Sequence, residues 1–419
     1  MKVYKFGGAS IKDGAGIKNL LDIVSKEQSE LIIVISASGK TTNALEKILD
    51  NWFAGDPKYT ELIDRLLEYH FKILYELSFE PDSDAVAYVY ATFEAIKDQL
   101  KTGKKENYDF EYDQLISYGE SLSVIMVNEY LKTRLDRMEM VDIRDCIITD
   151  NRYRDANIIW DKSVIRANSS FNFLNSRIYL TQGFVGATID GFTTTLGREG
   201  SDYTAAVLAN MLNAESVTVW KDVPGILNAD PVWMNEAQLL DEISYREAVE
   251  MTFSGAKVIH PKTIKPLHNK NIPLYVKSFI NPSSGGTIIK SDAVLKKVIP
   301  VYIKKENQIL ISILPRDFSF VMDENLSRIF HIFLQNGIKV NLVEASAVSI
   351  DVCVDDDRRR IDALIESMNE EFALVYNENV EMLTIRHYTP AAVNKITEGR
   401  EILLEQRMRS TVRFVVRKK

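Results

Sequence analysis

Two cations beside glycines mark places where this chain could bind an anion. Lys5 stands just before the pair Gly7-Gly8, and Arg198 lies in the glycine-bracketed turn 197–200. Exposed backbone N–H groups in a glycine turn can cradle a phosphate while an ammonium neutralises it. A guanidinium can grip a carboxylate with two parallel hydrogen bonds. A surface lysine and a solvent-facing turn arginine are the alternatives.

A helix is expected directly after the turn 197–200. Ser201 is a good N-cap residue, and Asp202 would lie in the first turn. The apolar stripe of this helix consists of Ala205, Ala206, Leu208, Ala209 and Leu212. The free N–H groups and positive dipole end of the helix would face the turn, where a carboxylate or phosphate could bind. The alternative is an ordinary turn before a packed helix.

Glu120 is a third candidate, because it follows Gly119 in a segment with a helical pattern. Glycine is disfavoured inside a helix, so its presence suggests that something approaches the backbone closely. Simple packing of one helix against another is the alternative.

Strand-like and helical segments alternate over the first two thirds of the chain. The strand-like segments are 3–6, 31–35, 140–143, 178–181, 217–220 and 274–276. The run 31–35 is continuously apolar, which is typical of a central parallel strand buried on both faces. Helical patterns dominate from 42 to 134, with breaks near Pro57, Pro81 and Gly103. We therefore expect an α/β fold with a mostly parallel sheet, covering helices, a helical insertion, and ligands at the carboxyl ends of strands.

The pattern changes near 291–300, after which glycines become few. Strands are expected at 309–313, 340–343, 348–354, 374–376, 382–385, 402–404 and 412–416, and helices at 323–336, 358–368 and 391–396. We interpret this part as two small α+β units packed together. The acidic run Asp355-Asp356-Asp357 is interpreted as an N-terminal helix cap with a solvated face, not as part of a phosphate site.

The composition favours a protein that acts on small molecules. At 419 residues, two or three domains are expected. The 51 basic and 59 acidic residues give a net charge of -8 without a long basic tract, which argues against a nucleic-acid or membrane partner. Cys146 and Cys353 lack the neighbours that a zinc site needs, so both are expected to be reduced core residues, and no metal-ligating cluster is predicted. No signal-peptide or membrane-spanning pattern is present, so a cytoplasmic protein is expected.

Two familiar nucleotide motifs are absent. Gly39-Lys40-Thr41 follows a buried strand like the end of a P-loop, but Val34 stands where that loop needs a glycine. No G-x-G-x-x-G turn joins a strand to a helix, so a dinucleotide site has no support.

A set of longer motifs resembles the aspartate kinase family, in that family's order. They are Lys5-Phe6-Gly7-Gly8-Ala9-Ser10, Ser36-Ala37-Ser38 with Thr42-Asn43, Ser117-Tyr118-Gly119-Glu120, Thr181-Gln182-Gly183-Phe184, Thr193 to Arg198 with Gly200 to Ala206, Asp222-Val223-Pro224-Gly225, Asp230-Pro231 and Gly255 to Pro261. The resemblance covers the whole chain. It implies an amino acid kinase fold for residues 1–290, a linker at 291–300 and tandem or interleaved ACT-like (ferredoxin-like) regulatory domains over 301–419. It also implies a monofunctional member, without the dehydrogenase that some members carry.

The implied reaction is that of ATP with L-aspartate, which gives ADP and 4-phospho-L-aspartate. This is the first step of lysine, threonine and methionine biosynthesis. A side-chain carboxylate with a free pKa of roughly 3.9 is already ionised at neutral pH, so the nucleophile needs no general base. Positioning and charge neutralisation must then do most of the catalysis. Mg²⁺ is expected mainly on ATP oxygens and water.

The resemblance also implies roles for individual residues. Lys5 would contact the transferring phosphoryl group, and Asp202 would order that region. Arg198 would bind the substrate α-carboxylate, and Glu120 would bind the α-ammonium. The other substrate-binding positions are Ser36 and Thr42, which would orient the β-carboxylate, and Ser201. The nucleotide would be contacted by Lys5, Gly7, Gly8, Lys221, Asp222, Gly225, Asp230, Pro231 and Lys257.

Four positions depart from the family pattern. Ala9 stands where threonine is common, and Leu227 stands where an aromatic residue often packs on adenine. Glu199 replaces a glycine and puts a negative charge beside the anion site unless it points outward. Lys221 replaces a small hydroxyl residue and could strengthen a phosphate or ribose contact.

An amino-acid effector, lysine or threonine, is expected to act through the ACT-like part. Segment 336–348 matches the family's effector loop in outline, and its candidate contacts are Asn341 and Ser346. The alternative is that these are strand and turn residues only. Pairing of sheet edges favours a homodimer or a higher homo-oligomer.

Two competing functions stay open. A relative such as acetylglutamate kinase acts on a blocked amine, which would leave a buried Glu120 carboxylate without compensation. A non-catalytic amino-acid sensor would have no need of Lys5 and Asp202.

Overall fold

The structure is a computed structural model that describes residues 1–103, 105–256, 259–293, 298–317, 319–321 and 324–418. The chain divides into two compact units. The first comprises Met1–Ile226, Leu239–Val249 and Ile259–Val294, and the second comprises Leu227–Gln238, Glu250–Val258 and Leu295–Lys419. Two segments that precede residue 290 in the sequence therefore group with the second unit.

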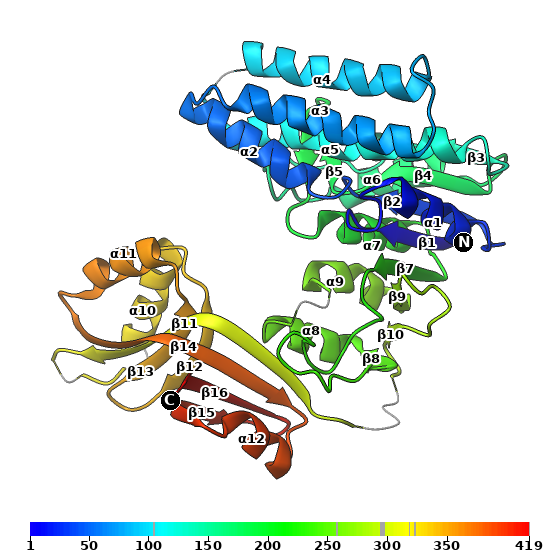
Figure 1. The fold of residues 1–419 in the computed structure, drawn as a ribbon. Coiled ribbons are helices and arrows are strands. Elements are labelled where there is room, and N and C mark those ends of the chain that lie inside the picture. Colours follow the sequence, from blue (N-terminus) through cyan, green and yellow to red (C-terminus); the bar gives the residue numbers. More distant parts are fainter. Residues whose placement is uncertain (104, 257–258, 294–297, 318, 322–323, 419) are drawn as a thin grey trace. The chain divides into compact units, whose positions relative to one another are not determined.

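Among the described residues, an eight-stranded sheet forms the centre of the first unit (Figure 1). In spatial order its strands are β3 (Met138–Met140), β4 (Ile178–Gln182), β2 (Leu31–Ile35), β1 (Lys2–Phe6), β7 (Ser216–Lys221), β9 (Leu274–Ser278), β10 (Thr287–Lys290) and β8 (Glu242–Ser244). Every pair from β3 to β9 is parallel, and only β9 and β10 pair antiparallel. The mostly parallel sheet is confirmed, and all five residues of β2 are buried, as expected of a strand covered on both faces.

The helices of the first unit cover this sheet. They are α1 (Gly14–Val24), α2 (Thr41–Ala54), α3 (Tyr59–Glu76), α4 (Asp84–Thr102), α5 (Tyr108–Leu131), η1 (Ile143–Asp145), α6 (Trp160–Ser170), α7 (Gly200–Met211) and α9 (Pro261–Asn269), with α8 (Tyr245–Phe253) contributing residues to both units. Helices α2 to α5 form the expected insertion and lie side by side (Figure 1). Helix α5 packs on β2 and β4, and α7 packs on β1, β2 and β7.

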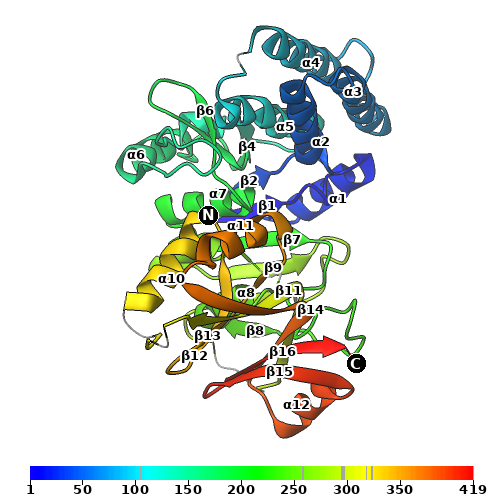
Figure 2. The same ribbon diagram turned by 90° about the vertical axis from the view of Figure 1, so that its left-hand side faces the viewer.

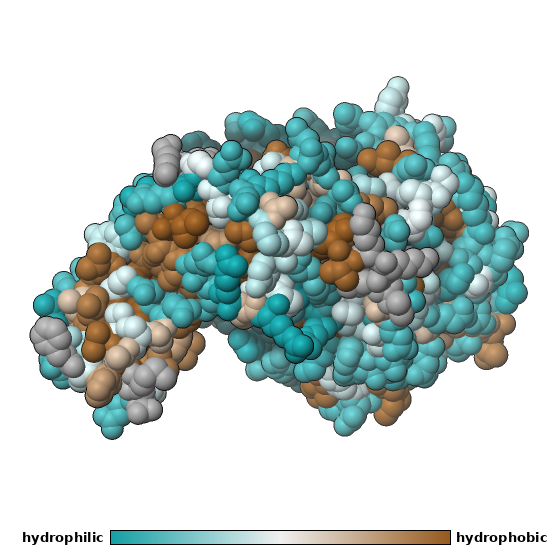
Figure 3. Space-filling view, turned by 90° about the horizontal axis from the view of Figure 1, so that it is seen from below, coloured by the Kyte–Doolittle hydropathy of each residue, from teal (hydrophilic) through white to brown (hydrophobic). Residues whose placement is uncertain are grey.

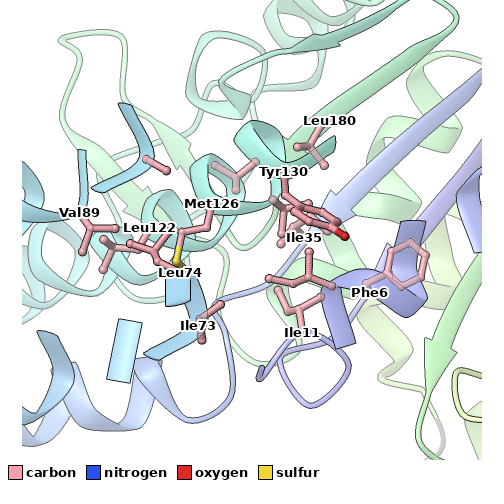
Figure 4. Packing of buried hydrophobic residues seen from close by; sticks show 14 of the residues in the cluster. Phe6, Ile11, Ile35, Ile73, Leu74, Val89, Leu122, Met126, Tyr130 and Leu180 are labelled. Carbon is pink, nitrogen blue, oxygen red and sulfur yellow. The ribbon is translucent and has the colours of Figure 1, made fainter. Parts of the chain in front are cut away.

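The largest core of the first unit joins the sheet to this helical layer. Phe6, Ile35 and Leu180 from three adjacent strands belong to the same cluster as Leu122 and Met126 from α5 (Figure 4). Burial of these side chains fixes α5, and with it Glu120, against the carboxyl ends of the central strands.

Four short strands and one helix boundary were not predicted from the sequence. Strands β8, β5 (Val185–Ala187) and β6 (Thr193–Thr195) have three residues each and β10 has four, too few to show a clear period. Helix α7 begins at Gly200, with Glu199 as its N-cap, so the prediction that Ser201 caps this helix is wrong. Gly197 and Glu199 both have left-handed backbone, with φ of +79° and +54°, which ends the turn one residue earlier than expected.

The second unit is built on one antiparallel sheet of six strands among the described residues (Figure 2). In spatial order these are β12 (Val340–Ala345), β13 (Ile350–Asp355), β11 (Val301–Pro315), β14 (Phe372–Arg386), β16 (Thr411–Lys418) and β15 (Arg400–Arg407). Its helices are α10 (Glu324–Gln335), α11 (Arg358–Met368) and α12 (Pro390–Thr397). Two α+β modules share the long strands β11 and β14, one with α10, α11, β12 and β13 and the other with α12, β15 and β16, so the expected ACT-like pair is interleaved.

Strand β14 corrects the prediction of separate strands at 374–376 and 382–385. The polar residues 377–379 interrupt the apolar pattern, and the register against β11 shifts there, between Lys305 and Leu310. The acidic run ahead of α11 does cap that helix, because the Asp357 side chain accepts a hydrogen bond from the Arg360 backbone N–H.

The face seen in Figure 3 is mostly hydrophilic, with hydrophobic residues gathered in several separate areas. Among the described residues, no helix is long and apolar enough to cross a membrane.

Candidate active site

A cavity of about 590 Å³ lies in the first unit and collects most of the predicted site residues. Its lining includes Lys5, Gly7, Gly8, Ser36, Thr42, Glu120, Arg198, Ser201, Asp202, Lys221 and Asp222. Strands β2, β1 and β7 are parallel neighbours, so the loops at their carboxyl ends meet at one edge of the sheet. Lys5 and Arg198, nearly two hundred residues apart in the sequence, both line the cavity.

Three predicted nucleotide contacts, Gly225, Asp230 and Pro231, are not among the residues that line this cavity. Gly225 is buried in the first unit, where an added Cβ would lie 2.7 Å from the Leu239 side chain. Asp230 and Pro231 are exposed residues of the second unit. Lys257 lies outside the described residues.

The turns after β1 and β2 lie directly against each other. The Gly39 backbone N–H donates to the Gly8 carbonyl at 2.9 Å. A Cβ on Gly8 would lie only 2.4 Å from the carbonyl oxygen of Ala37, so a side chain there would force the two turns apart. Gly8 thus allows the two loops to approach each other closely beside Lys5.

Two helices begin at the cavity without a side-chain cap. Helix α2 has Lys40 as its N-cap and α7 has Glu199, and neither side chain bonds to the first turn. The Thr41 N–H donates to the Ser38 carbonyl, and neither helix start has a side chain that would shield its positive dipole end from an anion. Thr42 and Ser201 lie in these two first turns.

Asp202 joins two lysines at the floor of the cavity. Its Oδ1 lies 2.6 Å from the Lys5 ammonium, and its Oδ2 lies 3.8 Å from that of Lys221. Burial alone would raise the pKa of Asp202, but the two cations hold this pKa below its usual value. Asp202 is thus an ionised carboxylate that orients Lys5, and Lys221 adds a second positive charge.

Glu120 is buried at the cavity with one oxygen unused. Its Oε2 has no hydrogen-bond partner among the described residues. Burial raises the pKa of Glu120 to about 8, although the charge of Lys5 and a hydrogen bond from the Ala37 backbone both act to lower it. A cationic group that entered the cavity would supply the missing partner.

Gly119 lets α5 approach the neighbouring elements. A Cβ there would lie 3.1 Å from the Thr41 side chain and 3.3 Å from that of Ala37. The alternative of close packing therefore accounts for this glycine, and the packing is what carries Glu120 to the cavity.

Arg198 is exposed on the cavity wall and has no hydrogen bond or ion pair with any residue the structure describes. The flanking turn is tight, because a Cβ on Gly197 would lie 2.5 Å from Asp155 Oδ1. Glu199 does not compete for the guanidinium, since its carboxylate accepts a hydrogen bond from the His260 backbone N–H at 2.9 Å. The Glu199 carboxylate is thus bonded to the N-cap residue of α9.

The cavity also contains residues that the sequence did not predict. They are Tyr112, Arg154, Phe184 and Trp220, besides the backbone of several turns. Trp220 is the penultimate residue of strand β7, next to Lys221, and its indole N–H is buried without a partner among the described residues. Trp220 could have been identified as a site residue because it is an aromatic residue at the carboxyl end of a predicted strand. Arg154 lies in a polar loop whose sequence gave no such indication.

Asn341 and Ser346, the candidate effector contacts, have different surroundings in the second unit. The Asn341 side-chain amide donates to Gln308 at 2.8 Å and to Asp355 at 3.0 Å, and it accepts from Lys305 at 2.8 Å. Ser346 lies in an exposed turn, where its hydroxyl bonds that of Ser349. The amide of Asn341 is occupied within the sheet.

Comparison with known proteins gives consistent matches. The model of the amino acid kinase family matches residues 1–278. Lysine-sensitive aspartokinase 3 of Escherichia coli (strain K12) is 32% identical over 355 residues, which is 84% of this chain and 78% of that protein. Bifunctional aspartokinase/homoserine dehydrogenase 2 of Arabidopsis thaliana is 28% identical, and this chain spans 42% of its length. The crystal structure of E. coli aspartokinase III in complex with aspartate and ADP has a TM-score of 0.83 at 28% identity, covering 99% of this chain and 96% of that one.

Proposed function

The chain belongs to the amino acid kinase family and, within it, to the aspartokinases, and from this premise we propose that it phosphorylates L-aspartate. The γ-phosphoryl group of ATP would pass to the side-chain carboxylate and give ADP and 4-phospho-L-aspartate, the first step of lysine, threonine and methionine biosynthesis. The observation that carries the proposal is that one cavity is lined by three kinds of charged group. They are Lys5 paired to Asp202, Glu120 with an unbonded oxygen, and Arg198 without an ion pair among the described residues.

Catalysis would rest on positioning and charge. The β-carboxylate is ionised at neutral pH, so no residue has to remove a proton from it. Lys5 would meet the transferring phosphoryl group, and Asp202 holds the Lys5 ammonium in place at 2.6 Å. Such a preoriented cation in a partly closed cavity stabilises developing charge more than a mobile one in water.

Opposite charges at the other end would orient the substrate. Arg198 would bind the α-carboxylate and Glu120 the α-ammonium, so the amino acid is held by both of its backbone charges. Ser36, Thr42 and Ser201 would direct the β-carboxylate toward Lys5, with support from the uncapped starts of α2 and α7.

The nucleotide would bind along Gly7, Gly8, Lys221 and Asp222, with Gly225, Asp230, Pro231 and Lys257 as further contacts proposed from the family pattern. No group of three or more His, Cys, Asp or Glu side chains in the described part of the chain could hold a metal ion. We expect Mg²⁺ to be carried by the ATP phosphates and water, where it would neutralise the phosphates.

Regulation and assembly follow the same premise. We expect lysine or threonine to act through the ACT-like modules of a cytoplasmic homodimer or higher oligomer. The two cysteines are buried and free, which suits a reducing compartment.

Trapping with hydroxylamine tests the proposal. Purified protein with ATP, Mg²⁺ and L-aspartate should form the aspartyl hydroxamate, and N-acetylglutamate in place of aspartate should form none, because Glu120 would then face no ammonium. Product from the acetylated acid alone would support the acetylglutamate kinase alternative. Binding of aspartate without any turnover would support a sensor.

A further inference from the structure

Arg154 lines the cavity in a backbone conformation that is unusual for arginine. Its φ is +68°, in the left-handed region that favours glycine. A residue with a side chain is strained in this region, so the conformation persists only where the surroundings impose it. Here the Arg154 backbone N–H donates to both carboxylate oxygens of Asp113 at 3.1 Å.

Asp113 ties Arg154 to the strand that leads to Arg198. This carboxylate is fully buried on α5 and also accepts from the Thr195 backbone N–H at 2.8 Å and from the Thr195 hydroxyl at 2.7 Å. Thr195 ends β6, three residues before Arg198. The carbonyl of Arg154 lies 3.4 Å from the place that a Cβ on Gly197 would occupy. One buried carboxylate thus links the backbone of Arg154 to that of Thr195, three residues before Arg198, and both arginines line the cavity.

The Arg154 guanidinium is held by weak ion pairs that a ligand could replace. It lies over the ring of Tyr112 at 4.4 Å, which fixes its plane. Its nitrogens are 3.4 Å from Asp109 and 3.9 Å from Glu46. Both carboxylates are at least 40% exposed, and exposed ion pairs of this length contribute little to stability. A carboxylate with better geometry inside the cavity would compete well.

We infer that Arg154 is a second substrate-binding arginine. Its guanidinium would separate from Asp109 and Glu46 and bind the α-carboxylate of the acidic amino acid beside Arg198. The inference rests on the proposed function and adds a specificity-determining residue to it. The two arginines would together hold the α-carboxylate, so that its negative charge is met by two cations.

The test uses Arg154→Gln and Arg154→Gly in the full chain, with Arg152→Gln as the matched control from the same loop, since Arg152 does not line the cavity. Loss of one charge-assisted contact should raise the KM for aspartate about tenfold, with kcat and the KM for ATP changed less than about twofold. Arg154→Gly suits the left-handed backbone and keeps the N–H that Asp113 accepts, so it should show the same KM effect without loss of thermal stability.

A third variant tests the exchange of partners. Asp109→Asn weakens the hold on the guanidinium and should lower the KM for aspartate modestly, about twofold. The inference is overturned if both Arg154 variants keep the wild-type KM for aspartate, or if the KM for ATP rises equally. Calorimetric titration of aspartate gives a second reading that needs no turnover. A wild-type protein that binds aspartate but forms no hydroxamate would end the proposed activity, and equal binding by Arg154→Gln would end this inference separately.

Discussion

Two groups of polar side chains, one at the cavity of the first unit and one around Asn341 in the second unit, differ in how far their hydrogen-bonding capacity is used. At the cavity of the first unit, Glu120 keeps a buried oxygen without a partner among the described residues, and Arg198 has no ion pair with them. In the second unit, Asn341 bonds Gln308, Asp355 and Lys305 at once. The polar groups at the cavity therefore have unused hydrogen-bonding capacity, whereas the Asn341 amide is fully bonded within its network. We call the first group the incomplete site and the second the closed network.

This difference separates a binding site from a structural network. A buried acceptor without a partner costs about 1–3 kcal/mol, so it is expected where a ligand supplies the partner. In the second unit burial would raise the pKa of Asp355, but its bonds with Gln308 and Lys305 hold that pKa below the usual range. The network there stabilises the paired strands without any ligand.

The largest effect on activity is expected when Lys5, the cation of the incomplete site, loses its positive charge. Lys5→Met should lower kcat at least about a thousandfold, because the transferring phosphoryl group loses its preoriented positive charge. Hydroxamate formation measures this, with the exposed Lys26→Met as control. Activity within tenfold of wild type would show that the ion pair of Lys5 with Asp202 is structural only.

Glu120 should give the site a pH dependence. With a pKa of about 8, its carboxyl is mostly protonated at neutral pH, whereas an ammonium needs the ionised form. Binding must therefore release a proton, and kcat/KM for aspartate should rise from pH 6.5 to a plateau above about pH 8. Glu120→Gln should abolish the slope and raise the KM for aspartate about 10–100-fold. A Gln variant that keeps the slope would assign the titration to another group; the exposed Glu94→Gln is the control.

The smallest effect on activity is expected in the closed network. Asn341→Ala removes donors to Gln308 and Asp355, so it should lower the free energy of unfolding by about 1–3 kcal/mol and leave kcat without effector unchanged. Thermal and urea unfolding measure this, and the exposed Ser346→Ala should change stability by less than about 0.5 kcal/mol. Unchanged stability with lost inhibition by lysine or threonine would instead give Asn341 a binding role.

The sequence predicted the elements that have a clear period or a continuous apolar run. Strand β2 was predicted with its observed bounds, and the insertion of α2 to α5 was predicted with its breaks. Strand β14 was split in two because the polar residues 377–379 lie where the register shifts, and pairing with a distant strand is invisible in a local pattern. The start of α7 was misplaced because left-handed backbone at Glu199, a non-glycine residue, has no sequence signature.

The site was predictable where charge stood beside glycine, as at Lys5 and Arg198. The spatial grouping of these residues depends on strand order, which the family motifs implied and the residues alone did not. Arg154 was missed because its place follows from a buried hydrogen bond to Asp113, 41 residues earlier in the chain. Such long-range anchors leave no local pattern.

The most direct test of the account is a crystal structure with L-aspartate and a non-hydrolysable ATP analogue. The account predicts the α-carboxylate within hydrogen-bond distance of Arg198, the ammonium on Glu120, and the β-carboxylate facing the γ-phosphate beside Lys5. Aspartate bound away from Glu120 and Arg198, or phosphates that make no contact with Lys5, would contradict it.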